Sequence, residues 1–271
     1  MSSHSLPAAD RRITVPQFRG MKGSGHKISM LTAYDYPFAA MLDECGVEGI
    51  LVGDSLSMVV QGNDSTLPVT LEEMIYHAEM VGRAVKRALI VVDMPFPSYH
   101  LGVYKAIDSA GSILKRTRCQ AVKLEGGVDQ AEVIAGLVAA GIPVMAHVGL
   151  RPQSVHQIGS YRVQRDTDEL LADAKAAEQA GAFAMVLECI TAEIAAKITA
   201  EIQIPTIGIG SGAECDGQIL VTHDLLGITG GRVPKHVKAY GRLRESIQSA
   251  VREYQQDVRK GQFPGLEQTF R

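Results

Sequence analysis

Three acidic residues stand at the ends of short apolar runs that follow one another along the chain. Asp54, Asp93 and Glu125 each mark the point where such a run gives way to a loop. Brief apolar runs of this kind are typical of buried strands. Adjacent strands lie about 4.8 Å apart, and active sites of parallel α/β proteins lie at the carboxyl ends of the strands. The three carboxylates can therefore converge on one point where chemistry is expected.

A cluster of three carboxylates repels itself and favours a bound cation. Oxygen ligands without paired histidines favour Mg²⁺, which needs few protein carboxylates and leaves positions open for substrate oxygens. The alternative is that each acid only caps the helix that follows its strand. Because the pattern recurs on three consecutive strands, it favours a metal site formed by Asp54, Asp93 and Glu125.

A lysine lies two residues before the third acid. Side chains alternate along a strand, so Lys123 and Glu125 point to the same side. An interior lysine is costly unless it is paired. The partner is either the acid cluster, in a purely structural ion pair, or an anionic substrate. A Schiff-base lysine, as in metal-free aldolases, is a third possibility.

Two further strand ends and one loop carry groups that could take part in catalysis or binding. Glu188 ends the sixth apolar run and is either a general base or the cap of the helix near Thr191. His147 ends the fifth run and is a ligand, a hydrogen-bond donor or a satisfied core histidine. The glycine-rich segment 208–212 either holds an anion through its backbone amides or simply turns tightly. It lacks the spacing of a dinucleotide fingerprint.

The elements that would position these groups alternate regularly. Seven apolar runs predict strands, residues 218–221 predict an eighth, and helical segments separate them. Such alternation favours a parallel sheet, and eight units favour a closed (β/α)8 barrel of the TIM type. The chain has 271 residues, close to the ~250 typical of that fold.

The ends of the chain lie outside the eight units. A cap followed by proline at Thr14–Pro16 predicts an N-terminal helix that closes the bottom of the barrel. An extra C-terminal helix is predicted over about 240–258, packed outside the barrel or on a neighbouring subunit. No linker divides the sequence, so we expect a single barrel domain over residues 1–271, with a flexible tail at 1–12 and a loose tail at 262–271.

Composition excludes several classes of protein. A charged share of 21% and a net charge of −3 argue against disorder and against a nucleic-acid partner. No apolar run approaches the roughly 20 residues of a membrane span, and the N-terminus lacks an apolar signal core. The four cysteines form no Cys-x-x-Cys pair, which favours reduced thiols over a zinc site. We therefore expect a cytoplasmic protein with no membrane partner.

Six motifs together strongly resemble the ketopantoate hydroxymethyltransferase family. The resemblance extends from about Thr14 to beyond Val251. Its motifs are Thr32–Asp35, Val52–Ser55, Asp93–Phe96, Val122–Gly127, Ala146–Leu150 and Gly208–Gly210.

The resemblance implies a magnesium-dependent, aldol-type transferase of pantothenate biosynthesis. Such an enzyme moves a hydroxymethyl group from the co-substrate 5,10-methylenetetrahydrofolate to 3-methyl-2-oxobutanoate (2-oxoisovalerate). The product is 2-dehydropantoate (ketopantoate). The partners implied are these small molecules and further copies of the chain, because family members form homodecamers; a homo-oligomer is thus expected.

The family's residue roles carry over by motif. Asp54 and Asp93 would ligate Mg²⁺, with Glu125 doing so directly or through water. A 2-oxo acid can chelate the metal, which stabilises the enolate formed when C3 loses its proton. Glu188 would remove that proton, and His147 is the next candidate. The residues implied to bind the substrate are Asp54, Ser55, Asp93 and Lys123.

Two rival interpretations remain at the level of the sequence. Barrels of the phosphoenolpyruvate mutase and isocitrate lyase type also bind Mg²⁺ and 2-oxo-acid enolates, but their Lys-Lys-Cys-Gly-His stretch does not occur in this sequence. A non-catalytic barrel that binds a phosphorylated ligand through its glycine loop is a different class of protein.

Overall fold

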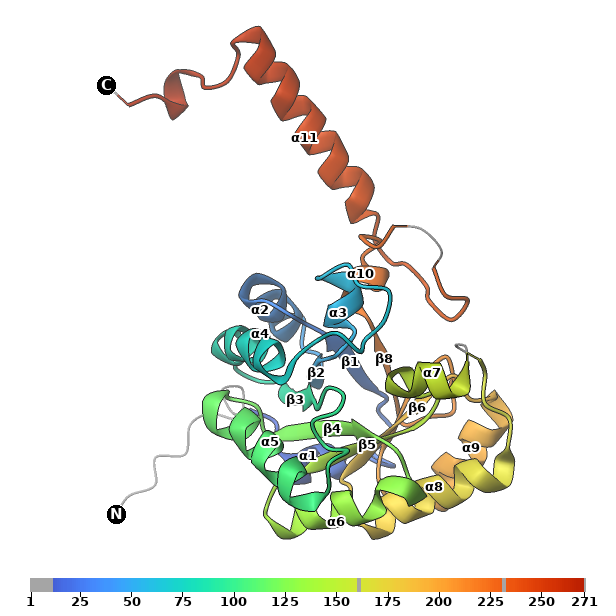
Figure 1. The fold of residues 1–271 in the computed structure, drawn as a ribbon. Helices are drawn as coiled ribbons and strands as arrows, with labels where there is room; N and C mark the ends of the chain where they lie inside the picture. The colour runs from blue at the N-terminus through green and yellow to red at the C-terminus, as the bar shows by residue number, and fades with distance from the viewer. Residues whose placement is uncertain (1–11, 160–161, 231–232, 271) are drawn as a thin grey trace. The chain divides into compact units, whose positions relative to one another are not determined.

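The computed structural model describes residues 12–159, 162–230 and 233–270 (Figure 1). The chain forms two compact units, Met1–Val221 and Thr222–Arg271, which are described separately here. The predicted single domain is not tested by this division and stays a prediction. The predicted flexible tail at 1–12 lies outside the described residues except for Arg12.

The first unit is a closed barrel of eight parallel strands, as the sequence predicts. Each strand is hydrogen-bonded to the next in chain order, and the eighth pairs with the first. The weakest prediction, the eighth strand, is confirmed at Gly217–Leu220. The strands are β1 (Ile28–Thr32), β2 (Gly49–Val52), β3 (Leu89–Asp93), β4 (Ala121–Glu125), β5 (Val144–Gly149), β6 (Ala184–Glu188), β7 (Thr206–Ile209) and β8 (Gly217–Leu220).

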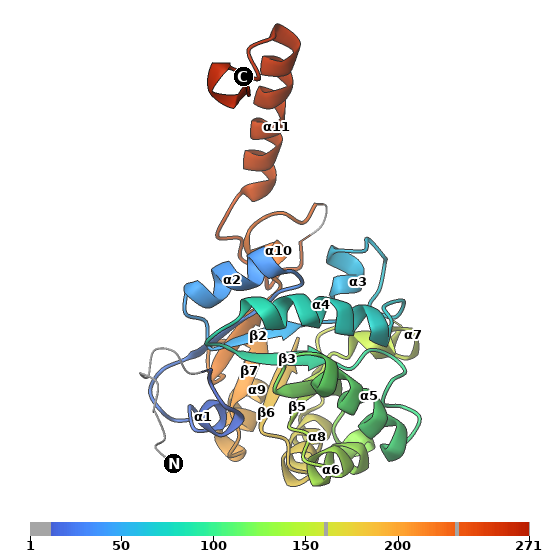
Figure 2. The same cartoon turned by 90° about the vertical axis from the view of Figure 1, so that its left-hand side faces the viewer.

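Helices surround the barrel on its outside (Figures 1 and 2). Their start signals are local: Thr70 and Glu73 form a capping box at the start of α4, and Asp35 caps α2. These caps satisfy backbone N–H groups that have no partner within the helix. The main outer helices are α2 (Tyr36–Glu44), α4 (Leu71–Ala84), α5 (Val103–Arg116), α6 (Ala131–Ala139), α8 (Thr167–Gln179) and α9 (Ala192–Glu201).

Short helices occupy two of the connections between strands. The loop after β2 begins with α3 (Leu56–Val59), and the loop after β5 contains the turn η3 (Pro152–Ser154) and α7 (Val155–Ile158). Each is a single turn or less, too short to show helical periodicity in a sequence. No helix among the described residues is long and apolar enough to cross a membrane.

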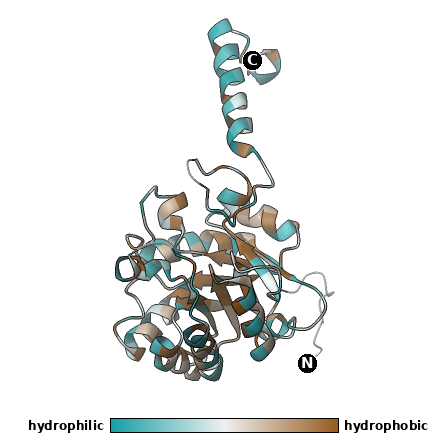
Figure 3. Cartoon of the chain, turned by 90° about the vertical axis from the view of Figure 1, so that its right-hand side faces the viewer, coloured by the Kyte–Doolittle hydropathy of each residue, from teal (hydrophilic) through white to brown (hydrophobic). Residues whose placement is uncertain are grey.

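The alternation of strand side chains produces two apolar cores. Ile90 and Val92 face outward into the core shared with the helices. Leu89 and Val91 belong to the smaller core inside the barrel. By the same period of two, Asp93 also faces inward. The barrel strands are correspondingly brown in Figure 3.

The N-terminal helix α1 (Val15–Arg19) closes the bottom of the barrel, as predicted. Its Phe18 is fully buried and belongs to the inner core. The Phe18 ring meets that of Phe183, directly before β6, in an edge-to-face contact with centroids 5.9 Å apart. This aromatic pair excludes water from the end opposite the carboxyl ends of the strands.

The second unit holds α10 (Thr222–Leu225), the predicted C-terminal helix α11 (Leu243–Lys260) and the turn η4 (Leu266–Gln268). The N–H of Leu243 donates to the carbonyl of Leu226, which ties the start of α11 to the segment after α10. No residue of α11 is buried, and the helix is mostly teal in Figure 3.

One buried carboxylate organises the connection into β3. Asp43, near the end of α2, accepts hydrogen bonds from the backbone N–H groups of Lys86 at 2.7 Å and Ala88 at 2.7 Å. The N–H of Arg87 donates to the same carboxylate at 3.1 Å. These three N–H groups lie in the short connection between α4 and β3 and have no partner in a helix or strand. The Asp43 carboxylate therefore accepts the hydrogen bonds that water would otherwise accept.

We expect Asp43→Ala to lower the free energy of unfolding by about 3 kcal/mol, because hydrogen bonds to a charged acceptor are lost and buried donors remain unpaired. Urea unfolding followed by circular dichroism measures this. The control is Glu44→Ala, which removes an exposed carboxylate from the same helix and should change stability by less than about 0.5 kcal/mol. Equal effects from the two variants would contradict the role given to Asp43.

Candidate active site

Strand register brings the predicted site residues together at the carboxyl end of the barrel. Asp93 on β3 is paired in register with Lys123 on β4. Glu125 on β4 is likewise opposite His147 on β5. Glu188 ends β6 opposite Gly149. The predicted groups on four consecutive strands therefore lie within one polar cluster.

Lys123 is paired inside this cluster rather than free. Its Nζ lies 2.8 Å from Asp93 Oδ1, and both side chains are buried. Burial alone would lower the pKa of Lys123, but the carboxylates of Asp93, Asp54 and Glu125 outweigh burial and raise the pKa above its usual value. An ammonium held in this way is a poor nucleophile, so the geometry favours an ion-pairing role over a Schiff base.

The buried acids outnumber the buried cations. Burial and the neighbouring Asp93 raise the pKa of Asp54 to about 7. Burial and the Asp54 charge raise the pKa of Glu125 well above its usual range. Lys123 offsets only part of this negative charge. A bound cation would stabilise the ionised acids, and the donor set therefore fits a divalent metal ion.

The arrangement limits how many acids can reach such an ion. Within 12–159, 162–230 and 233–270, no group of three or more His, Cys, Asp or Glu side chains is placed to hold a metal ion. Asp54 and Asp93 are directly linked, since the Asp54 N–H donates to Asp93 Oδ2 at 3.0 Å. Mg²⁺ is commonly bound through one or two carboxylates plus water and substrate oxygens. Two direct acids, with Glu125 behind water, suit that preference.

His147 lies between the lysine and Glu188. Its Nδ1 is 3.3 Å from Lys123 Nζ, and its Nε2 is 3.2 Å from Glu188 Oε2. Burial and the Lys123 charge lower the pKa of His147, which keeps the ring neutral. Because an ammonium group only donates, Nδ1 must accept and the ring proton belongs on Nε2, facing Glu188. His147 is therefore part of the cluster and not a residue of the apolar core.

Glu188 differs from the other acids in its access to solvent. Its side chain is 19% exposed, whereas that of Glu125 is 3% exposed. Its backbone is fixed on both sides: the N–H of Leu150 donates to the carbonyl of Glu188. A carboxylate with a fixed backbone and partial access to solvent at the carboxyl end of the barrel is suited to exchange protons with a bound molecule.

Ser55 contacts a tyrosine that the sequence analysis did not assign a role. The hydroxyls of Ser55 and Tyr34 are 2.8 Å apart, and burial raises the pKa of the Tyr34 phenol. A Cβ on Gly53 would stand 2.9 Å from Ser55 Oγ and 3.4 Å from Asp93 Oδ2. Any larger residue at position 53 would therefore displace the Ser55 hydroxyl from this position. Tyr34 lies within Thr32–Asp35, one of the motifs that carry the family resemblance, and this motif was the signal in the sequence that could have identified it.

Two further residues of the cluster have no counterpart among the sequence predictions. Gln153, in η3, donates from Nε2 to Asp54 Oδ2 at 2.9 Å, and its backbone N–H donates to Glu125 Oε2 at 3.1 Å. Tyr99 donates its hydroxyl to Gln153 Oε1 at 2.9 Å. Both residues come from loops, and their types alone gave no indication of these contacts.

The glycine-rich segment 208–212 acts as a packed turn. Ser211 Oγ donates to the carbonyl of Leu187 at 2.7 Å and accepts from the N–H of Ile190 at 3.2 Å. A Cβ on Gly212 would come within 2.7 Å of Ala192 Cβ. These contacts support the tight-turn interpretation and fix the backbone on either side of Glu188.

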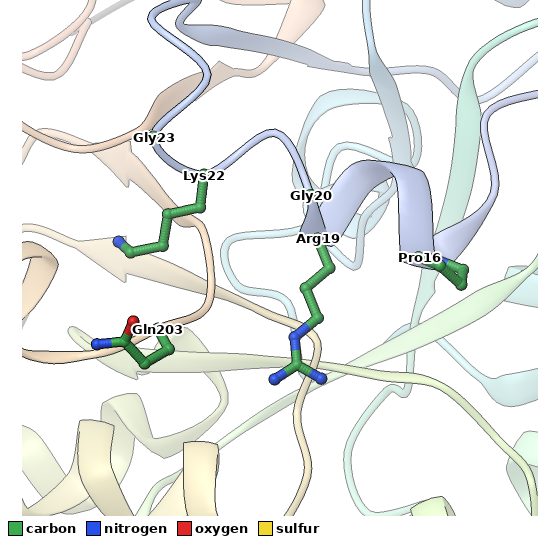
Figure 4. Close-up of a pocket in the computed structure, with 6 residues that line it drawn as sticks. All are labelled: Pro16, Arg19, Gly20, Lys22, Gly23 and Gln203. Carbon is green, nitrogen blue, oxygen red and sulfur yellow. The ribbon is translucent and has the colours of Figure 1, made fainter.

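A separate hollow of about 590 Å³ lies at the other end of the barrel (Figure 4). Its Lys22 is already neutralised, since Nζ lies 2.8 Å from Asp216 Oδ2 and donates to the carbonyl of Thr199 at 2.9 Å. In this fold, residues at this end of the barrel typically contribute to stability rather than to catalysis. The residues that line the hollow are Pro16, Arg19, Gly20, Lys22, Gly23 and Gln203.

Solved structures of low sequence identity share this fold. Phosphoenolpyruvate phosphomutase from Streptomyces platensis subsp. rosaceus superposes with a TM-score of 0.63 at 15% identity, covering 92% of this chain and 88% of that one. 2,3-Dimethylmalate lyase, a member of the PEP mutase/isocitrate lyase superfamily, gives 0.60 at 17% identity, covering 96% and 92%. The rival barrels considered from the sequence thus share the architecture, and the likeness extends to the fold alone.

Sequence relatives are much more similar. The 3-methyl-2-oxobutanoate hydroxymethyltransferase of Rhodopirellula baltica is 52% identical over 259 residues, covering 96% of each chain. The relative of the same name from Carboxydothermus hydrogenoformans is 54% identical over 263 residues, covering 96% of this chain and 95% of that one. A family model described as ketopantoate hydroxymethyltransferase matches residues 12–266. By this match, and by these relatives, the chain belongs to the ketopantoate hydroxymethyltransferase family.

Proposed function

We propose that this protein transfers a hydroxymethyl group from 5,10-methylenetetrahydrofolate to 3-methyl-2-oxobutanoate, giving 2-dehydropantoate for pantothenate biosynthesis. Its family and the names of its relatives support a hydroxymethyltransferase. The observation that carries the proposal is the excess of buried negative charge at the carboxyl end of the barrel, where Asp54, Asp93 and Glu125 face a single lysine. A metal and a chelating 2-oxo acid fit that environment.

The proposed metal ligands are Asp54 and Asp93, with Glu125 acting through water. When bound, Mg²⁺ supplies positive charge next to the developing enolate oxygen. The protein contributes the fixed positions: Asp93 is held by the Asp54 N–H and by Lys123. Lys123 and the Ser55 hydroxyl are donors that can hold the oxygens of the 2-oxo acid.

Glu188 is the proposed base. Its carboxylate takes the proton from C3 of the 2-oxo acid, and the resulting carbanion equivalent forms the new carbon–carbon bond to the one-carbon unit of the folate. One water supplies the hydroxyl oxygen, both carbon–nitrogen bonds to the methylene group break, and tetrahydrofolate leaves with one proton from C3 and one from water on its two nitrogens. His147 Nε2 lies 3.2 Å from that carboxylate and is the neighbouring group that we propose to orient it. Asp93 is unsuited to this step, because it is engaged by Lys123.

The direct test is formation of ketopantoate from 3-methyl-2-oxobutanoate and 5,10-methylenetetrahydrofolate, with and without a chelator. We expect turnover that the chelator abolishes and added Mg²⁺ restores. Asp54→Ala and Asp93→Ala should each lose Mg²⁺ binding in calorimetry while circular dichroism stays unchanged, because both acids stand at strand ends.

The matched control is Asp64→Ala, which removes an exposed carboxylate from the loop after β2 and should leave Mg²⁺ binding intact. Full turnover in the presence of the chelator, or normal Mg²⁺ affinity in both site variants, would reject the metal assignment.

For the base, we expect Glu188→Gln to keep Mg²⁺ and substrate binding but to lose about 10²–10⁴ in rate, the usual contribution of a positioned base. The assay is exchange of the C3 hydrogen of 3-methyl-2-oxobutanoate with deuterated water, followed by NMR, and it needs no folate. The comparison variant is Glu193→Gln on α9, an exposed glutamate outside the cluster. If Glu188→Gln exchanges as fast as the parent, the base lies elsewhere, and His147 is the next candidate.

We also propose that the protein is a homo-oligomer and that α11 takes part in its assembly. Ile247, Val251, Tyr254 and Val258 are between 46% and 56% exposed. They recur at intervals of four, three and four residues and so form one apolar stripe along the helix. Such a stripe is normally covered by another apolar surface, and a second copy of the chain is the partner we propose.

The test places two negative charges on this stripe with Val251→Glu and Tyr254→Glu together. We expect a smaller particle in multi-angle light scattering, because charged groups cannot be buried unpaired between subunits. The control adds the same charge to the opposite face of α11 with Ser249→Glu and Gln256→Glu, and should keep the parent mass. An unchanged mass in the stripe variant would rule out the role of α11.

A further inference from the structure

One loop glutamine contacts two of the three acids from outside the strands that carry them. Gln153 is 6% exposed and reaches Asp54 with its side chain and Glu125 with its backbone N–H. Its Nε2 also donates to the carbonyl of Met94 at 3.0 Å. It thereby connects the loops that follow β2 and β3 with the end of β4.

The orientation of the Gln153 amide follows from its partners. The Met94 carbonyl can only accept, so the atom beside it must be the NH₂ group. On the other side, the Tyr99 hydroxyl accepts from the N–H of Glu125 at 3.3 Å and must use its own proton toward Gln153 Oε1. The amide cannot rotate by 180° without placing oxygen against oxygen at two points.

The Asp54 carboxylate is held by this amide. It lies beyond the end of β2, so no strand fixes its backbone as β3 fixes Asp93. Among the described residues, Gln153 is the one hydrogen-bond donor to its carboxylate. The Asp93 carboxylate, which accepts from the Asp54 N–H, lies close by and repels the negative charge of the Asp54 carboxylate.

We propose that Gln153 is a positioning residue for the metal site: it holds Oδ2 of Asp54 and so directs Oδ1 toward the cation. This inference rests on the proposed metal ligands and adds a residue to them. Groups that orient a metal ligand typically contribute 10- to 100-fold to metal affinity. Tyr99 supports the same arrangement one step further out by fixing the amide.

The test is isothermal titration of the purified protein with MgCl₂. We expect Gln153→Met, which keeps the length of the side chain and removes both the oxygen and the nitrogen of the amide, to bind Mg²⁺ about 10- to 100-fold more weakly while circular dichroism shows an intact fold. Gln157→Met, an exposed glutamine on α7, is the matched control and should bind as the parent does. A residue that only fastened its loop would lower the melting temperature and leave Mg²⁺ affinity unchanged.

The outcomes separate this inference from the proposed function. If the parent binds Mg²⁺ and Gln153→Met binds it equally well, the positioning role is overturned and the metal site stands. If the parent binds no Mg²⁺, both fail. If Gln153→Met does not fold, Tyr99→Phe decides the question: a loss of about three- to tenfold in Mg²⁺ affinity, equivalent to one neutral hydrogen bond, supports the role, and no loss overturns it.

Discussion

Three carboxylates and one ammonium group share the buried carboxyl end of the barrel, and the rest of the site is arranged around that imbalance. Lys123 offsets part of the charge by pairing with Asp93 at 2.8 Å. Hydrogen bonds from Gln153 and from backbone N–H groups stabilise the acids further, and Tyr99 donates to Gln153. These donors are neutral, so the excess negative charge of the carboxylates remains.

The sequence was sufficient for the parts of the site that lie on strands. A period of two places Lys123 and Glu125 on one side of β4. Parallel pairing of consecutive strands then sets Asp93 beside Lys123 and Glu125 beside His147. The eight repeats and the bottom-closing helix follow equally from local patterns. In a regular helix or strand, the spacing of residues along the sequence determines where their side chains lie. Residue types and intervals could therefore predict these positions.

The parts that could not be predicted lie on loops or depend on distant partners. Gln153 meets Asp54 across 99 positions of the sequence, and no periodicity links two loops. The two hydrogen bonds of the Tyr99 hydroxyl and the lowered pKa of His147 depend on which groups burial brings together.

The different roles of strands and loops explain how one architecture serves different chemistries. The barrel core needs only apolar side chains at alternate strand positions, a condition that many sequences satisfy, so a phosphomutase can share the fold at 15% identity. The reactive groups are few and stand at strand ends, while the loops determine how each is held. In this chain the strands fix Asp93, Lys123 and Glu125, and a loop amide fixes Asp54. Changing such a loop would alter how Asp54 is held without disturbing the barrel, because its backbone takes no part in the sheet.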